Sequence, residues 1–218
     1  MNHLQSVQSF VQNDMQWVCQ AHDRYHIERV CTIATHITQS YKDADIIVVQ
    51  YWALLHEYFD DKFFESHQLE WRKNILEEFL STLNISTQQK ESICFIAKNV
   101  GYWKSKARDP ELLLPIEFKI VEDSDRLEAV WAIAIARCFA YGSTKWRAIY
   151  DPNELSRDEI TRENYRLWSG TAINHFYEKL LLLKDLMHTP EAKKIAEKRH
   201  AFMEQYLQEF FKERNCQF

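Results

Sequence analysis

Apolar residues recur every three or four positions along most of this chain, which is the pattern of amphipathic α-helices. Residues 46–55 differ, because they are apolar on nearly every side of a helix, and they are predicted to lie at the centre of the core. The repeating pattern itself predicts helices over residues 5–18, 23–40, 65–83, 86–100, 116–140, 160–187 and 189–213. The sequence therefore predicts an all-α protein.

Two segments lack this pattern. Residues 101–115 hold one glycine, two prolines and the basic residues Lys104, Lys106 and Arg108, and they are predicted to form a loop. The loop is either a lid over a ligand or a solvated surface segment, which is the commoner meaning of such a run. Residues 143–158, with Lys145 and Arg147, form the second irregular segment.

Composition supports this picture and limits the function. Three glycines and four prolines among 218 residues leave little material for the tight turns of a β-rich fold. A net charge of −5 provides no broad basic surface for nucleic acid or anionic membrane, which favours a small soluble ligand. The five cysteines form no CxxC pair, which indicates reduced thiols. With no signal sequence and no long apolar run, the expected compartment is the cytoplasm.

Polar residues interrupt three of the predicted core helices. His26, with His22 and Arg29, lies on the helix 23–40, and Asp123 and Asp125 lie on the helix 116–140. The apolar run 46–55 ends in a third group, which contains His56, Glu57, Asp60, Asp61 and Lys62. Burying such groups costs several kcal/mol unless they are paired or bind a metal. If the helices converge, imidazoles and carboxylates form a site suited to Mn²⁺, Fe²⁺ or Mg²⁺.

These motifs resemble those of the HD-domain metal-dependent phosphohydrolases, a helical family with a histidine, a His-Asp pair and a distant aspartate. The resemblance is closest to small stand-alone bacterial members that are similar to nucleotide pyrophosphohydrolases. The matching segments are HDRYHIERV at 22–30, LLHEYFDDKF at 54–63, VEDSDRLEA at 121–129, IARCFAYG at 135–142 and HFYEKL at 175–180. The resemblance implies one HD-type bundle of about eight to ten helices over residues 1–218. Its motif core covers about 20–140, and the helices 160–213 pack on it.

The resemblance also implies a ligand set and roles. His26, His56, Glu57 and Asp125 are expected to bind a divalent metal, most readily Mn²⁺, with Mg²⁺, Fe²⁺ and Ni²⁺ as other options. The ion would hold and acidify a water, and the expected reaction hydrolyses a nucleoside triphosphate to the monophosphate and pyrophosphate. The residues expected to act on the water and the phosphates are Asp60, Lys62 and Arg29. Lys104, Lys145 and Arg147 could close over the substrate tail. No nucleic-acid or membrane partner is expected, and a homodimer is among the options.

One position departs from the family pattern, because Glu57 stands where the family has aspartate. The longer side chain either still binds the ion or weakens the site, and the second case predicts a catalytically impaired nucleotide-binding protein. Simpler interpretations remain for other residues. Asp123 could cap a helix, His22 could be a polar residue at a helix start, and Trp52, Trp131 and Trp168 are predicted to be core residues.

Overall fold

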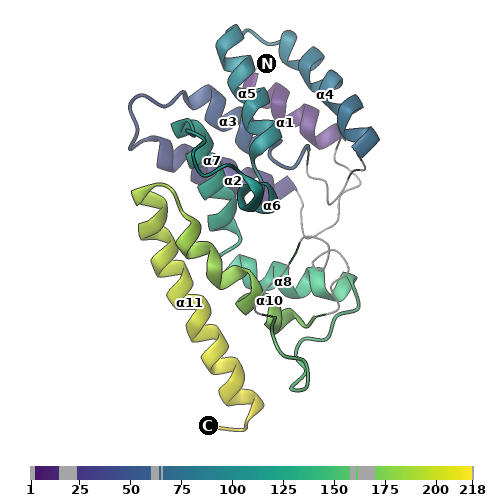
Figure 1. Cartoon of the computed structure of the whole chain (residues 1–218), viewed down its shortest axis with the longest axis vertical. Coiled ribbons are helices and arrows are strands. Elements are labelled where there is room, and N and C mark those ends of the chain that lie inside the picture. The colour runs from purple at the N-terminus through teal and green to yellow at the C-terminus, as the bar shows by residue number, and fades with distance from the viewer. Residues whose placement is uncertain are drawn as a thin grey trace. The chain divides into compact units, whose positions relative to one another are not determined.

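A computed structural model of the chain describes residues 3–14, 24–59, 64, 66–157, 161 and 170–217. These residues form ten α-helices and one 3-10 helix, with no strand among them, which confirms the all-α class (Figure 1). The chain divides into two compact units, Met1–Asp125 and Arg126–Phe218. That the whole chain is one domain stays a prediction. No helix in the described part is long and apolar enough to cross a membrane.

The first unit is built around α3, Ile46–Leu55. Asp45 starts this helix, because its side chain accepts hydrogen bonds from the backbone N–H groups of Ile47 and Val48. Residues 51–55 are all buried, and Trp52 is completely so. Around α3 pack α1, α2 and α5. The helices of this unit are α1 (His3–Asp14), α2 (Arg24–Thr38), α3, α4 (Ser66–Ser81), α5 (Thr87–Asn99), α6 (Tyr102–Ala107) and α7 (Ile116–Glu128), whose last three residues belong to the second unit.

The second unit packs short elements against one long helix. Its elements are α8 (Ala132–Thr144), α10 (Ala172–Glu178), the 3-10 helix η2 (Leu180–Leu186) and α11 (Pro190–Arg214). Thr189 caps α11 by accepting from the N–H of Ala192, and Pro190 occupies the first helical position. Contacts of α11 with η2 and α8, and of α10 with both, hold this unit together.

Three predicted elements are wrong in part. The loop 101–115 contains the helix α6, because Gly101 at φ 135° acts as its N-cap. The single helix 116–140 is two helices, and the break lies at Trp131, which has φ 129°. The charged run 122–126 does not end α7, which continues to Glu128. The single helix 160–187 is likewise divided at Lys179, where φ is −145°. Residues 160 and 162–169 of that prediction lie outside the described residues.

Two predictions about single side chains are also wrong. Trp131 is 48% exposed and not part of the core, whereas Trp52 is buried as predicted. Asp123 does not cap a helix, because it lies in the middle of α7 and is completely buried. Trp168 and His22 lie outside the described residues.

Candidate metal centre

The site begins where α3 ends. His56 is the C-cap residue of this helix, with φ −60° and ψ −28°, so its backbone still follows the helix. Its Nδ1 lies 2.7 Å from the carbonyl oxygen of Ala53. A carbonyl can only accept, so Nδ1 carries the hydrogen and Nε2 presents a lone pair. Such a hydrogen bond orients an imidazole for metal binding.

His26 on α2 faces the same point. It is buried, and its Nε2 lies 3.1 Å from Nε2 of His56, with the two rings at 78° to each other. The neighbouring residues Ile27 and Val30 are buried, so this approach is set by the packing of α2 on α3. Two imidazole nitrogens at this separation either share a proton or bind one cation.

Two carboxylates complete the group. Oε1 of Glu57, which is buried, lies 3.5 Å from Nε2 of His26. Oδ1 of Asp125 on α7 lies 3.8 Å from Nε2 of His26 and 3.7 Å from Nε2 of His56. The Asp125 side chain is 35% exposed, so the site is open to solvent beside it.

The spacing of these donors fits a metal ion. Neighbouring ligands at about 2.1 Å from an octahedral ion lie about 3 Å apart, and the donor atoms of His26, His56 and Glu57 all lie within 4.8 Å of one another. Nitrogen and carboxylate oxygen are the ligands that Mn²⁺, Fe²⁺ and Ni²⁺ accept. The residues present therefore fit a divalent cation.

The pKa of His56 also favours metal binding. Burial lowers the pKa of His56, although the carboxylates of Asp125 and Glu57 act in the opposite direction. A lowered pKa keeps the imidazole neutral at pH 7, which is the form that binds metals. The thiols of Cys31 and Cys138 are poor metal ligands, because burial raises the pKa of Cys31 to about 11 and that of Cys138 to about 12.

Comparison with known proteins identifies the family. No family model matches the chain. A protein from Lactobacillus plantarum has 31% sequence identity and a TM-score of 0.82, with 98% of this chain and 97% of that one covered. An HD-superfamily hydrolase from Bacillus thuringiensis has 35% identity and a TM-score of 0.72, with the same coverage. The chain belongs to the HD superfamily of hydrolases. Bacillus subtilis YpgQ, solved in complex with ADP, has 29% identity and a TM-score of 0.74, with 96% and 97% of the two chains covered.

Membership of the HD superfamily supports a metal-dependent phosphohydrolase. The other residues that the sequence predicts for the site lie as follows. Arg29 lies one turn after His26 on α2 and is half-buried. Asp60 and Lys62 lie outside the described residues. Lys104 donates to the carbonyl of Ala97 at 3.4 Å, within the first unit. Lys145 and Arg147 belong to the second unit.

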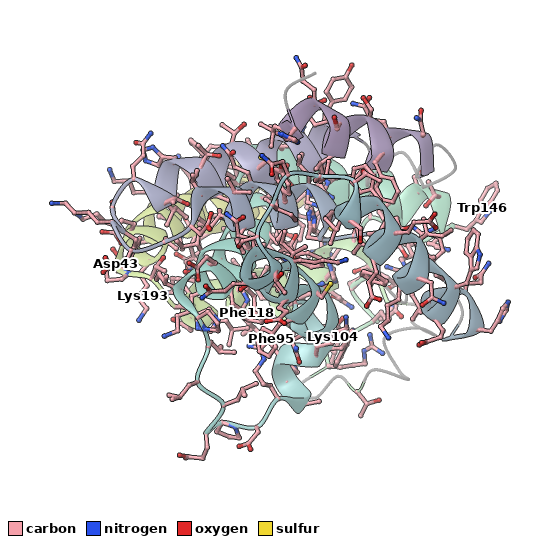
Figure 2. All side chains as sticks on the ribbon, turned by 90° about the horizontal axis from the view of Figure 1, so that it is seen from above. Asp43, Phe95, Lys104, Phe118, Trp146 and Lys193 are labelled. Atoms are coloured by element: carbon pink, nitrogen blue, oxygen red, sulfur yellow. The ribbon has the colours of Figure 1, made fainter. Side chains whose placement is uncertain are left out.

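Arg108 forms a buried ion pair that was not predicted from the sequence. Its guanidinium forms two hydrogen bonds, of 3.1 and 2.8 Å, with the buried carboxylate of Glu122, and a third, of 2.9 Å, with the carbonyl of Asn99. The guanidinium lies over the ring of Phe118. Phe118 in turn packs on Phe95, and both rings are labelled in Figure 2. This pair anchors α7 three residues before Asp125. The sequence contains the basic run 104–108 and the acidic run 122–125, but no local pattern predicts that the two runs contact each other.

Arg72 is the second missed residue. It is buried on α4, its Nε donates to the carbonyl of Tyr58 at 2.9 Å, and its guanidinium stacks on the ring of Tyr58. The N–H of Tyr58 in turn donates to the carbonyl of Leu55 at 2.8 Å. Arg72 thereby holds the turn that carries Glu57. A buried arginine in an amphipathic helix has no signal that separates it from a surface one.

Proposed function

We propose that this protein hydrolyses nucleoside triphosphates to the monophosphate and pyrophosphate with a divalent metal, most readily Mn²⁺, held by His26, His56, Glu57 and Asp125. The observation that carries the proposal is the convergence of two imidazole nitrogens and two carboxylate oxygens at the end of a buried helix. The ADP bound to YpgQ favours a nucleotide as substrate.

The chain supplies the remaining chemistry. When bound, a divalent ion supplies positive charge that polarises a phosphoryl oxygen and makes a nearby water easier to deprotonate. The water oxygen forms a bond to the α-phosphorus, the bond from that phosphorus to the bridging oxygen breaks, and pyrophosphate leaves. Asp60 is proposed to accept the proton from the water, and Arg29 and Lys62 are proposed to neutralise the phosphate charge.

The decisive experiment measures metal binding and turnover on the same preparations. Metal-stripped protein is titrated with Mn²⁺ by calorimetry, and a panel of nucleotides is then assayed with product identification by phosphorus NMR. We expect His26→Ala to weaken Mn²⁺ binding by at least tenfold and to abolish hydrolysis. His36→Ala is the matched control, because His36 lies on the same helix with an exposed side chain. Absence of both metal binding and turnover in the unaltered protein would refute the proposal.

A silent nucleotide-binding protein is the second candidate, and the observation behind it is Glu57 at the family's aspartate position. The Glu57→Asp variant separates the two. A site adapted to glutamate loses Mn²⁺ affinity or activity with the shorter side chain, because the carboxylate then falls short of the ion. A large rise in Mn²⁺-dependent hydrolysis would instead show that the native site is impaired.

A further inference from the structure

Arg72 occupies a position in the buried stripe of α4. Leu76 and Leu80, which follow it at intervals of four residues, are each 1% exposed, and Arg72 itself is 4% exposed. Residues four apart lie on the same face of a helix, so the arginine faces the core together with the two leucines. Burying a cation is costly. An arginine at this position therefore needs contacts that an apolar side chain could not make.

The contacts of Arg72 lie on two residues that follow Glu57 in the sequence. Its Nε donates to the carbonyl of Tyr58 at 2.9 Å. Its Cζ lies 3.9 Å from the centre of the Tyr58 ring and 3.8 Å from the centre of the Phe64 ring. A guanidinium can combine these contacts because its planar face stacks on aromatic rings while its N–H groups donate in the plane. Arg72 thus holds the chain directly after Glu57 and again at Phe64.

Tyr58 is held firmly by its other neighbours as well. It is completely buried, and its N–H donates to the carbonyl of Leu55 at 2.8 Å. Its ring lies 5.4 Å from that of Phe10, which stacks on Phe79 of α4 at 4.0 Å. The helix α4 therefore reaches Tyr58 at two points, directly through Arg72 and indirectly through Phe79. The backbone direction at Tyr58 is set by α4.

Glu57 is bonded directly to Tyr58, and its Oε1 lies 3.5 Å from Nε2 of His26. A glutamate has one more rotatable bond than an aspartate, so its carboxylate keeps one direction only where its backbone is fixed. We propose that Arg72 is a positioning residue of the metal site, which sets the direction of the Glu57 carboxylate by holding Tyr58. The inference rests on the metal ligands of the proposed function and adds to them a residue that acts through Glu57.

Calorimetry with Mn²⁺ on the metal-stripped, full-length protein tests this role by a double-mutant cycle. Arg72→Lys keeps the positive charge but loses the planar stacking and the Nε donor. We expect it to weaken Mn²⁺ binding by about tenfold. In the Glu57→Gln background the same change should alter the affinity by less than about twofold, because the carboxylate through which Arg72 acts is gone. An equal loss of affinity in both backgrounds would overturn the inference.

Two variants of α4 separate positioning from stability and from charge. Leu76→Ala destabilises the same helix by removing buried apolar volume. Lys73→Met removes a positive charge next to Arg72, from a side chain that is 35% exposed and pairs with Glu70. Each should leave the Mn²⁺ affinity of the folded protein within about twofold of the unaltered value. If Leu76→Ala weakened Mn²⁺ binding as much as Arg72→Lys, the arginine would serve stability alone and the inference would be wrong.

Hydrogen exchange without metal measures the turn itself. The amide of Tyr58, which donates to Leu55, should exchange about tenfold faster in Arg72→Lys and at the unaltered rate in Lys73→Met. Unchanged exchange in Arg72→Lys would contradict the role of the arginine. Coupled loss of Mn²⁺ affinity in a protein that turns over no nucleotide would support the positioning role and refute the proposed hydrolysis. Turnover in a protein whose cycle shows no coupling would refute only the role of Arg72.

Discussion

At the scale of single residues, protonation decides what the histidines can do. His56 and His175 both have a lowered pKa, and the main cause in each case is burial. The two differ in their neighbours. Carboxylates lie beside His56, as a cation site requires, whereas Lys179 and Arg147 act on His175.

The lowered pKa of His175 predicts a loss of stability in acid. Above pH 6.5 the imidazole is neutral in both folded and unfolded protein, so the group contributes no pH dependence. As pH falls below 6.5, His175 becomes protonated in the unfolded chain but stays neutral in the folded protein. The free energy of unfolding therefore decreases by at most about 1.4 kcal/mol per pH unit. Urea unfolding in EDTA at pH 7.5 and 5.5 measures the loss. It should be smaller in His175→Gln, and an equal loss in both proteins would contradict the assignment.

At the scale of elements, α7 depends on one ion pair. Arg108 and Glu122 are joined by two hydrogen bonds in a largely buried setting, and Asp125 follows three residues later on the same helix. The position of the Asp125 carboxylate, a proposed metal ligand, therefore depends on an arginine 17 positions earlier in the sequence.

Arg108→Met should lower the free energy of unfolding by about 3–5 kcal/mol, because Glu122 would remain buried without its cation. Mn²⁺ affinity should fall by about tenfold or more, since Asp125 loses its support. Calorimetry and urea unfolding measure the two effects. The double variant Arg108→Met with Glu122→Leu is the control and should recover most of the stability. A single variant with unchanged stability would show that the pair does not anchor α7.

In the turn after α8, one residue has a backbone conformation that is unfavourable for its type. Trp146 has φ 55°, in the left-handed region where glycine is usual, and its side chain is 97% exposed and projects into solvent (Figure 2). The hydrogen bonds from Trp146 to Ser143 and from Arg147 to Gly142 form a Schellman motif, which normally has glycine at this position.

Trp146→Gly should therefore stabilise the protein by about 1 kcal/mol, because it relieves the left-handed strain and removes no buried surface. The expected rise in Tm is about 2–4 °C by calorimetry. Trp146→Ala removes the ring but keeps a Cβ, so it should change Tm less. A fall in Tm for the glycine variant would mean that the indole makes contacts that stabilise the fold.

At the scale of the whole molecule, the proposed metal site belongs to one of the two units. All four proposed metal ligands lie in Met1–Asp125. Each unit has its own packed helices, so a ligand of one unit is expected to stabilise that unit first.

Mn²⁺ at 100 times its Kd should stabilise the folded protein by about 2.7 kcal/mol. Hydrogen exchange should locate the effect, with slower exchange in α2, in α3 and in the part of α7 before Arg126, and little change in α11. Ca²⁺, which prefers all-oxygen sites, is a suitable control ion. Equal slowing across both units would contradict a site confined to the first one.

The sequence by itself determined the helical class and the central place of residues 46–55. The proposed metal ligands come from family resemblance and stay a prediction. These features depend on local periodicity and on short motifs, which involve residues close together in the sequence. Tertiary structure alone decided the 3.1 Å approach of His26 to His56, the pairing of Arg108 with Glu122 and the breaks at Trp131 and Lys179. These features arise when residues distant in the sequence pack together, and local patterns do not encode which distant partner a side chain will meet.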